Sequence, residues 1–394
     1  MISGFWQKCG FWSNELIQKW KNNEDWIWFH AVSVGEINAI WPLVKSLREK
    51  KDSYGYMIST TTNAGFNRLK QLTNNTNIFI FYFPFDLPWI VKSLLNKVNV
   101  KALIIAETEI WPTVLSECER RNIPTILTNA RLSDRSFKNY KTFKFFFKGV
   151  INRFSEVLSQ SESDSHKFKE LGLEKSKLKT LGNIKFSIDE NLNNKQSDFI
   201  RAKNTDIKII FASTHDGEEE IAVNVYKNLL HEYKNIQLII APRHIERVQQ
   251  IKKIISRNSF HPVLRTSSDK IISSNEILVL NTIGELVDFY KIAQITVLGG
   301  TFTKIGGHNI IEPVRAESYT IIGPYNYKIR ELTALFKNED AIVQVKDVSE
   351  LEYRLKEAIS NKELRETKIR NGKRIIKRNQ NVLKETTERI ISYL

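Results

Sequence analysis

The sequence predicts an α/β fold with two domains, each built on a parallel sheet. Short apolar runs alternate with helical segments along most of the chain, a pattern typical of strands joined by crossover helices. The 394 residues exceed one ordinary domain, and 41% of them are hydrophobic, which suffices for two cores. A polar stretch, residues 187–206, separates two series of apolar runs. We therefore expect two Rossmann-like domains with a ligand cleft between them, at the carboxyl ends of the strands.

Each predicted strand is a short apolar run bounded by polar residues. The first series covers Trp26–Val32, Gly55–Ser59, Ile78–Phe83, Ala102–Ala106, Thr125–Leu127 and Glu156–Ser159. The second covers Ile207–Ala212, Ile236–Ala241, Ile277–Leu280, Ile295–Leu298 and Thr320–Ile322. Helices such as Asn38–Lys50, Trp89–Lys97 and Glu218–Tyr233 lie between them. With Ser187–Asp206 as the linker, the domains are expected over residues 1–190 and 200–394, and the last helix could pack back on the N-terminal domain.

The composition favours an anionic partner and a reducing compartment. Lys and Arg outnumber Asp and Glu by 59 to 44, and the net charge of +15 suits anionic lipid, nucleic acid or a phosphorylated substrate. No recognisable nucleic-acid motif accompanies the charge, so nucleic acid is not the expected partner. Cys9 and Cys118 form neither a disulfide framework nor a metal-binding spacing. No apolar run approaches the roughly 20 residues of a membrane-spanning helix, so a peripheral protein without a transmembrane anchor is expected.

Residues 137–154 combine lysines at helical spacing with phenylalanines on the other side. A basic amphipathic helix of this kind can lie on an anionic membrane. The same pattern also suits a surface helix whose aromatic side packs into the core. On the pattern alone we favour this second interpretation.

Polar residues follow several predicted strands of the first series. Ser33 and Glu36 have capping-box spacing, so a helix start is the simplest interpretation. The functional interpretation makes Glu36 a general base whose pKa is raised by partial burial. Glu107 and Glu109 follow another strand, and the expected turn leaves at most one of them facing the cleft. Arg131, after a third strand, could bind phosphate or carboxylate.

The strand ends of the second series also carry polar groups. Ser213 follows one strand, and Arg243 with His244 follows the next; these side chains could present hydroxyl or cationic groups to a phosphate. The segment Asn281–Leu286 could form part of a base or ribose pocket.

The segment Gly299–Pro313 contains two glycine pairs and suggests a nucleotide-linked donor. Glycines let a backbone approach a ligand and turn unpaired N–H groups toward an anion. A helix that begins near His308 would add its positive end, and Glu312 could then accept the hydroxyls of a ribose. The spacing matches neither the dinucleotide-binding fingerprint nor the P-loop, which argues against a dehydrogenase and a P-loop kinase. No clustered His and Cys set suggests a metal site, and no cofactor is expected.

Taken together, a series of motifs resembles those of the 3-deoxy-D-manno-octulosonic acid (Kdo) transferases. They keep the order of that family and cover roughly residues 26–325. The motifs are WFHAVSVGE (28–36), TTTNAGF (60–66), YFPFDLP (82–88), ETEIWP (107–112), NARLS (129–133), LGNIKF (181–186), STHDGEE (213–219), APRHIER (241–247) and GGHNIIEP (306–313).

The resemblance implies a GT-B glycosyltransferase that moves Kdo from CMP-Kdo to a phosphorylated lipid A precursor in lipopolysaccharide biosynthesis. The implied reaction is inverting and metal-independent. The implied place is the cytoplasmic face of the inner membrane, with an N-terminal acceptor domain and a C-terminal nucleotide-sugar domain.

The same resemblance places the general base on Glu36 and a supporting acid on Glu109. To the acceptor side we add Ser33, Gly35 and Arg131. The residues expected to bind the donor are Ser213, Arg243, His244, Ile283, Gly284, Glu285, Gly306, Gly307, Asn309 and Glu312.

Two alternatives stay open. The sequence departs from the family pattern in its donor half, at Asn281, Ile283, Tyr325 and Lys328–Ile329. A transferase of the same family with a different sugar nucleotide or acceptor is therefore the alternative among enzymes. A hypothesis of another class is a catalytically silent basic protein that binds anionic lipid or nucleic acid. A pure binder would not need the combined set of Glu36, Arg243, Asn309 and Glu312.

Overall fold

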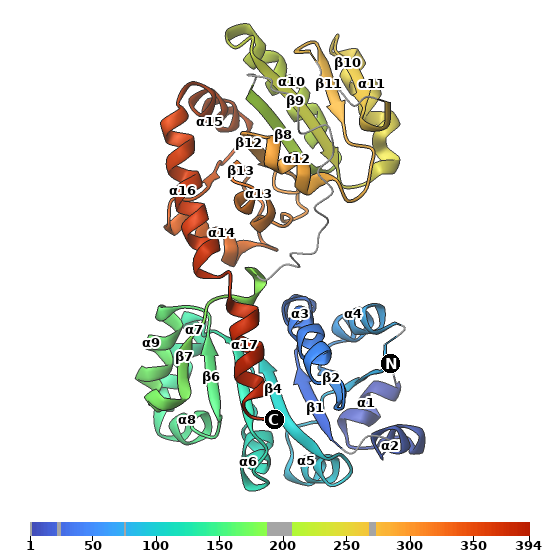
Figure 1. Ribbon diagram of the computed structural model, residues 1–394, viewed down its shortest axis with the longest axis vertical. Coiled ribbons are helices and arrows are strands. Elements are labelled where there is room, and N and C mark those ends of the chain that lie inside the picture. The colour runs from blue at the N-terminus through green and yellow to red at the C-terminus, as the bar shows by residue number, and fades with distance from the viewer. Residues whose placement is uncertain (1, 22–24, 75, 187–206, 268–272) are drawn as a thin grey trace. The chain divides into compact units, whose positions relative to one another are not determined.

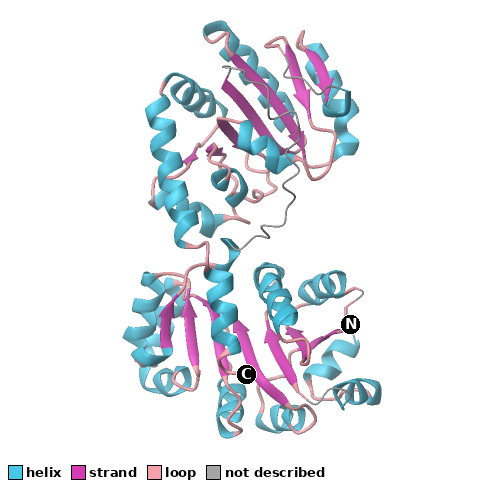
Figure 2. Ribbon diagram, in the orientation of Figure 1, coloured by secondary structure: helices cyan, strands magenta, loops and turns pink. Residues whose placement is uncertain are grey.

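The computed structural model describes residues 2–21, 25–74, 76–186, 207–267 and 273–394. The chain forms two compact units, Met1–Glu190 together with Asn379–Leu394, and Asn191–Arg378. Each unit contains one parallel sheet with helices packed on it, which confirms the predicted α/β class (Figures 1 and 2). The predicted linker Ser187–Asp206 lies outside the described residues.

The sheet of the first unit has the strand order β3-β2-β1-β4-β5-β6-β7, and all its pairs are parallel. Its strands are β1 Trp26–His30, β2 Gly55–Thr60, β3 Ile78–Tyr82, β4 Val100–Ala106, β5 Thr125–Ala130, β6 Glu156–Ser159 and β7 Leu178–Thr180. Its helices are α1 Ile2–Lys8, α2 Asn14–Lys21, α3 Val34–Lys50, α4 Asn63–Thr73, α5 Pro88–Leu95, α6 Pro112–Arg120, α7 Asp134–Thr142, α8 Lys144–Ile151, α9 Glu162–Leu171 and α17 Val382–Ile391, with short 3₁₀ turns η1 Lys175–Lys177 and η2 Ile184–Phe186.

Alternate residues of each central strand enter different cores, because successive side chains of a strand point to opposite faces. In β1, Trp26 and Trp28 belong to a core that also contains residues of α2, α5, α6, α8 and α9. Ile27 and Phe29 belong to a second core with residues of α3, α4 and α17. Both faces of the strand are buried, which explains its continuous apolar run in the sequence.

The second unit repeats this plan with the strand order β10-β11-β9-β8-β12-β13-β14, again all parallel. Its strands are β8 Ile207–Thr214, β9 Ile236–Pro242, β10 His261–Leu264, β11 Glu276–Val279, β12 Ile295–Leu298, β13 Tyr319–Ile322 and β14 Val343–Gln344. Its helices are α10 Glu218–Glu232, α11 Val248–Arg257, α12 Leu286–Ile292, α13 Ile311–Arg315, α14 Arg330–Asn338, α15 Val348–Ser360 and α16 Lys362–Arg378, with 3₁₀ turns η4 Ile245–Arg247 and η5 Arg265–Ser267.

Each sheet has a switch point, where the chain stops adding strands on one side and starts on the other. In the first sheet the switch lies between β1 and β4, and in the second between β8 and β12. Ligands of open parallel sheets bind at the carboxyl ends of the strands at such points. The segments that follow β1, β4 and β12 contain Glu36, Glu107–Glu109 and the glycine segment, and Ser213–Glu218 begin within the last two residues of β8. The fold thus places most of the predicted site residues at the two switch points.

The segment 137–154 differs from our expectation. It forms two helices, α7 and α8, which meet at Phe143. Phe137 and Tyr140 pack against the core, but Phe143, Phe145 and Phe146 are 65%, 100% and 57% exposed. The interpretation that the phenylalanines pack into the core is therefore wrong for these three residues.

The last helix, α17, packs against α3 in the first unit, where Val382 and Ile390 join its core. Arg389 of this helix forms an ion pair with Glu156, whose side chain is almost fully buried at the start of β6. We expect Arg389→Ala to lower the free energy of unfolding by about 3–5 kcal/mol, because the Glu156 carboxylate is left buried without its partner. Urea unfolding measures this loss. Lys384→Ala, on the exposed side of the same helix, is the control, and an equal effect of both variants would contradict the prediction.

Candidate functional site

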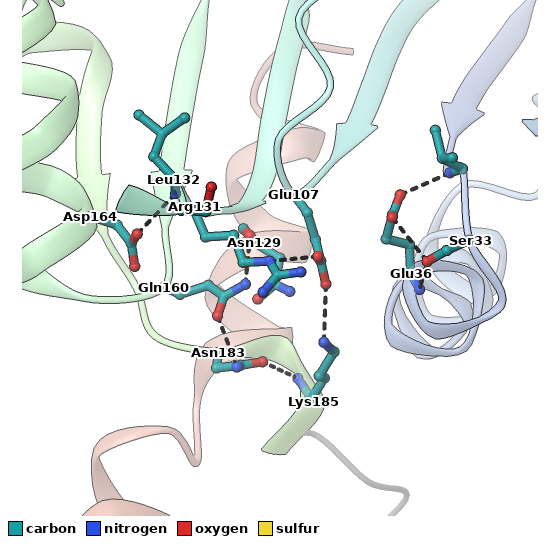
Figure 3. A network of polar contacts seen from close by, with 12 residues as sticks. Ser33, Glu36, Glu107, Asn129, Arg131, Leu132, Gln160, Asp164, Asn183 and Lys185 are labelled. Carbon is teal, nitrogen blue, oxygen red and sulfur yellow. Dashed lines mark hydrogen bonds and ion pairs between the residues drawn. The ribbon is translucent and has the colours of Figure 1, made fainter. Parts of the chain in front are cut away.

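Glu36 lies in the first turn of α3, next to the end of β1 (Figure 3). Its Oε1 accepts a hydrogen bond from Ser33 Oγ at 2.9 Å, and its Oε2 accepts one from the Val32 backbone N–H at 2.8 Å. Ser33 Oγ in turn accepts from the Glu36 backbone N–H at 3.2 Å. The predicted helix start is confirmed, with Ser33 as the N-cap and Glu36 accepting from the N–H of the residue before it, and the same contacts fix the carboxylate at the switch point. Gly35 is not required for this turn, since an added Cβ would meet only Ser33 Oγ, at 3.7 Å.

Glu107 forms the centre of a second polar group after β4 (Figure 3). Its side chain is buried, and its backbone has a φ of +57°, which a non-glycine residue rarely adopts. Its Oε2 lies 2.7 Å from Arg131 Nε, and its Oε1 lies 3.1 Å from Lys185 Nζ. One buried carboxylate therefore holds two cationic side chains from distant parts of the chain.

A hydrogen-bond network fixes the backbone around Lys185 (Figure 3). The Asn129 side-chain oxygen accepts from the Ile184 backbone N–H at 3.0 Å, and Asn183 Nδ2 donates to Gln160 Oε1 at 2.9 Å. Asn183 Oδ1 accepts from the Lys185 backbone N–H at 2.9 Å. Asn379, just before α17, accepts from the Asn183 backbone N–H at 2.8 Å. Contacts from three separate segments thus fix the backbone that carries Lys185.

The electrostatics of the first switch point raise the pKa values of two carboxyl groups, those of Glu36 and Glu109. Burial raises the pKa of Glu36, and the charge of Glu107 adds to this, while hydrogen bonds from Val32 and Ser33 oppose it. Burial raises the pKa of Glu109 to about 7, with a further contribution from the nearby charge of Glu36. A carboxylate with a raised pKa is a stronger base than one in water, as proton abstraction from a hydroxyl requires.

His30, the last residue of β1, has a structural role. Its ring is fully buried and stacks on Phe83 with centroids 3.8 Å apart, and its Nδ1 lies 3.0 Å from Ser59 Oγ. Burial lowers the pKa of His30 to about 3, so the ring is neutral at physiological pH.

In the second unit, Glu218 fixes the glycine segment to the end of β8. Its Oε2 accepts hydrogen bonds from the backbone N–H groups of Gly300 at 2.7 Å and His215 at 2.9 Å. Its Oε1 accepts from the Phe302 backbone N–H at 2.9 Å. Ser213 has a φ of +57°, and a Cβ at Gly299 would come within 2.4 Å of the Ser213 carbonyl oxygen. The two loops therefore approach so closely that only glycine fits at position 299.

The second glycine pair differs from our expectation. The N–H groups of Gly306 and Gly307 both donate to the Gly300 carbonyl, at 2.9 and 2.7 Å, so the prediction that they turn unpaired toward an anion is wrong. These glycines have φ values of +99° and +89°, and a Cβ would come 2.6 Å from the Tyr327 ring and 2.7 Å from Ile329. Glycine is needed here for conformation and close packing.

The helix after this segment also differs. It begins at Ile311, not near His308, and spans only five residues, so its end is not an anion site of the kind we expected. Asn309 Oδ1 accepts from the Ile311 backbone N–H at 3.0 Å, and Asn309 Nδ2 donates to Glu312 Oε1 at 2.8 Å. Burial raises the pKa of Glu312, while the positive charges of Arg315 and Arg243 oppose this. Asn309 thus orients a carboxylate that lies within the electrostatic reach of Arg243.

The remaining donor-side residues lie on loops of the same unit. His244 Nδ1 lies 3.2 Å from Glu246 Oε1 on the protein surface. After β11, Ile283 is 85% exposed and Gly284 has a φ of +93°. Glu285 pairs with Arg265 at 3.1 Å. Asn281, one of the positions that depart from the motif pattern, donates a hydrogen bond from its Nδ2 to Thr266 Oγ1 at 2.8 Å.

Comparison with known proteins identifies the family. Residues 3–188 match the family model described as 3-Deoxy-D-manno-octulosonic-acid transferase (kdotransferase). The chain is 31% identical over 372 residues to a 3-deoxy-D-manno-octulosonic acid transferase of Haemophilus influenzae, covering 93% of this chain and 87% of that protein. The chain belongs to the Kdo transferase family.

Two further similarities describe how this Kdo transferase family member relates to other proteins. It is 33% identical over 338 residues to a bifunctional glycosyltransferase/methyltransferase of Fusobacterium nucleatum, but spans only 52% of that relative's length. The structure of UDP-GlcNAc 2-epimerase from Neisseria meningitidis, bound to UDP-GlcNAc, matches with a TM-score of 0.55 at 13% identity, covering 93% of this chain and 100% of that one. At this identity the likeness shows the fold alone, which is GT-B.

Two residues of this Kdo transferase family member were not predicted as site residues. Lys185 lies in the LGNIKF motif, but nothing in the sequence links one lysine among 59 basic residues to Glu107. Glu218 lies in STHDGEE, where it reads as an ordinary first-turn acid of α10. Across the described ranges, no helix is long and apolar enough to cross a membrane. Within those same ranges, no group of three or more His, Cys, Asp and Glu side chains could hold a metal ion.

The raised pKa of Glu109 predicts a pH-dependent stability. A folded-state pKa of about 7, against a model value of 4.5, means that the folded protein holds this proton more tightly than the unfolded chain. The stabilisation from this proton is complete below the pKa that Glu109 has in the unfolded chain, and it is lost as the pH rises through the pKa that Glu109 has in the folded protein. We expect Glu109→Gln to remove a stability change on the order of 1 kcal/mol across this window, measured by urea unfolding at several pH values. Glu119→Gln, at an exposed position, should keep the wild-type profile, and an unchanged profile for Glu109→Gln would refute the assignment.

Proposed function

We propose that this protein transfers Kdo, or a related 2-keto sugar acid, from its CMP-linked form to a phosphorylated glycolipid of the lipid A pathway. The reaction proposed is inverting and metal-independent. Membership of the Kdo transferase family supports the donor and the reaction class. The observation that carries the chemistry is Glu36, a half-buried carboxylate of raised pKa that is fixed at the switch point of the first sheet.

In this proposal Glu36 removes the proton from the acceptor hydroxyl as that oxygen attacks the anomeric carbon of the donor. The bond from that carbon to the phosphate oxygen breaks, and CMP leaves with the electron pair. Glu36 keeps the proton until it passes to water. The negative charge of Glu107 raises the pKa of Glu36, and the negative charge of Glu36 raises the pKa of Glu109. Because Glu36 and Glu109 interact in this way, we assign Glu109 a role in support of Glu36.

The second unit is the proposed donor domain. Arg243 and Lys328 lie on loops at the carboxyl end of its sheet, and both contribute positive potential at His308. Positive groups placed where a phosphate leaves stabilise the developing charge. Glu312, oriented by Asn309, is assigned to the ribose hydroxyls, and Ser213, His244 and the segment Ile283–Glu285 to the rim of the donor site.

The first unit is the proposed acceptor domain. Arg131 and Lys185 each pair with one oxygen of the Glu107 carboxylate. Arg131 also lies close enough to Glu36 for its positive charge to lower the pKa of Glu36. A phosphorylated acceptor brings anionic groups that such cations recognise. Ser33, the half-buried N-cap of α3, and Gly35, exposed in its first turn, are assigned to the acceptor sugar.

We also propose that the protein works as a peripheral protein at the cytoplasmic face of the inner membrane. The exposed Phe143, Phe145 and Phe146 lie in a helical region that also carries Lys138, Lys141, Lys144 and Lys148. Exposed aromatic residues beside lysines favour the surface of an anionic bilayer. A lipid-linked acceptor would be presented at that same surface.

The exposed phenylalanines predict membrane binding that can be measured. Replacing Phe143, Phe145 and Phe146 together by Ser should lower co-sedimentation with phosphatidylglycerol-containing vesicles by about tenfold or more, because apolar area is lost from the contact. Tyr353→Ser, at an exposed aromatic residue of α15, is the control. Equal binding of the triple variant and the wild type would rule this surface out.

Nucleotide binding separates the alternatives. Calorimetry with CMP, UMP and GMP at equal concentration should show selective binding of CMP, which Arg243→Ala weakens. Selective binding of another nucleotide would favour a family member with a different donor. No nucleotide binding at all would favour the catalytically silent binder.

A further inference from the structure

Two histidine side chains of the second unit share a hydrogen bond at its switch point. His215 Nε2 and His308 Nε2 lie 2.7 Å apart, and the two rings are nearly parallel, with an interplanar angle of 6° and centroids 5.0 Å apart. His215 follows β8, and His308 follows the second glycine pair. A third imidazole, His244, lies with its centroid 5.7 Å from that of His215.

The Nε2–Nε2 contact limits the charge of the pair. A hydrogen bond between two imidazole nitrogens needs one nitrogen that carries the hydrogen and one that accepts it. If both rings were protonated, both Nε2 atoms would carry hydrogens and the contact would become repulsive. While the contact lasts, the pair therefore carries either no charge or one positive charge.

The surroundings of the pair favour the uncharged form. Burial lowers the pKa of His215 and lowers that of His308 to about 4. The charged or titratable groups that act on the two rings are one acid, Glu218, and the cations or imidazoles Arg243, His244, Arg247 and Lys328. Glu218 is already hydrogen-bonded to three backbone N–H groups.

The local positive charge is only partly balanced. Arg247 is paired with Asp216 and Glu219, both at 2.7 Å. In the part of the chain that the structure describes, neither Arg243 nor Lys328 has an ion-pair partner. An anion bound beside the pair would balance these charges. The same anion would favour the protonated form of the imidazoles.

We propose that His215 and His308 form a proton-linked anion site, which takes up one proton from solvent when the phosphate of the nucleotide ligand binds. This inference rests on the proposed function, because it assigns the phosphate to the donor. No covalent bond changes in this step. The proton is held by the histidine pair, and its charge offsets the extra negative charge that CMP carries once it is a phosphate monoester.

The proposal predicts that phosphate affinity depends on pH. The bound pair holds its proton at a higher pH than the free pair, so CMP affinity should fall as pH rises from the pKa of the free pair to that of the bound pair, by up to about tenfold per pH unit, and should level off above it. The dependence should weaken when one of the two histidines cannot titrate and disappear when neither can.

Calorimetric titration of the purified full chain with CMP, in buffers of different ionisation enthalpy, counts the protons taken up. At about pH 7 we expect the wild type to take up as much as about one proton more per CMP than His215→Gln or His308→Gln. Glutamine keeps a hydrogen-bonding amide but has no titratable group. The double variant should take up the fewest protons, because each single variant keeps one imidazole that can titrate. His261→Gln, at an exposed position on β10, should behave as wild type.

Three ligands distinguish the anionic group. CMP carries the phosphate, cytidine lacks it, and free Kdo carries only the carboxylate. Proton uptake with CMP and none with cytidine supports the proposal. Uptake with Kdo but not with CMP would overturn the assignment to phosphate. CMP binding with the same proton count in wild type and both glutamine variants would overturn the inference and leave the proposed function intact, whereas no CMP binding would overturn both.

Nitrogen-15 NMR of the wild type gives a readout that does not depend on the variants being folded. The signals of His215 and His308 should report an uncharged pair in the free protein near neutral pH and a protonated pair with CMP bound. Two imidazoles that titrate independently near the ordinary histidine pKa of about 6.5, with no change on CMP addition, would contradict the proposal.

Discussion

Glu36→Gln is expected to lower the rate of sugar transfer by roughly 100- to 10,000-fold, the usual contribution of a positioned general base. Glutamine can keep this helix start, because its side-chain oxygen can accept from the Val32 backbone N–H and its amide nitrogen can donate to Ser33 Oγ. The variant should therefore unfold at nearly the same urea concentration as the wild type. Its affinity for CMP should also be unchanged, since Glu36 belongs to the first unit and the proposed donor site to the second.

A matched control for this variant lies on the same helix. Glu49 is exposed near the end of α3, and Glu49→Gln should leave the transfer rate within about twofold of the wild type. Full activity of Glu36→Gln would remove Glu36 from the role of base. Loss of activity together with loss of stability would instead assign it to the capping box alone.

Glu218→Ala is expected to destabilise the second unit by roughly 3–6 kcal/mol. The substitution leaves the buried N–H group of Gly300 and the half-buried N–H groups of His215 and Phe302 without their acceptor, at about 1–3 kcal/mol for a fully buried unsatisfied group and less for a half-buried one. CMP binding should weaken by about tenfold or more, because the glycine segment and the loop after β8 lose their common anchor. Urea unfolding and CMP titration measure the two effects.

The neighbouring Glu220 provides the control for Glu218. It lies in the same turn of α10 but is exposed, so Glu220→Ala should change stability by less than about 0.5 kcal/mol. Glu218→Gln should fall between wild type and Glu218→Ala, since an amide retains one oxygen acceptor. Equal stabilities for the alanine variants at 218 and 220 would mean that the carboxylate does not anchor the loop.

The sequence was a good guide to the two sheets, because their central strands are buried on both faces. All predicted strands form, and the parallel α/β architecture follows from them. The strands that we did not predict are β7, β10 and β14, which are all edge strands. Their residues are mostly half-buried or exposed, so they lack the apolar run that signals a central strand.

The structure brings most of the predicted site residues to the switch points, whereas several of the contacts predicted for them differ. Polar residues at strand ends can be read from the sequence, and the strand order brings those ends to the switch points. What each polar group contacts depends on partners that are distant in the chain. Glycine N–H groups can face a ligand or close a loop, and in Gly306 and Gly307 they close it on Gly300. The ion pair of Glu107 with Lys185 joins residues with no shared periodicity, so only the fold reveals it.

Residues 137–154 show a different limit. A core-facing and a membrane-facing aromatic helix share one amphipathic pattern, because both need one apolar side. The break at Phe143 divides the segment, so that Phe137 and Tyr140 reach the core and Phe145 does not. The sequence alone does not indicate that break.

The central claim is most directly tested by incubating the purified protein with CMP-Kdo and a phosphorylated lipid A precursor, and measuring CMP and glycosylated lipid together. The account predicts that both products form in equal amounts with the wild type and with Glu49→Gln, and that neither forms at a comparable rate with Glu36→Gln. Formation of the glycolipid from another sugar nucleotide but not from CMP-Kdo would contradict the proposed donor. Undiminished transfer by Glu36→Gln would contradict the proposed mechanism.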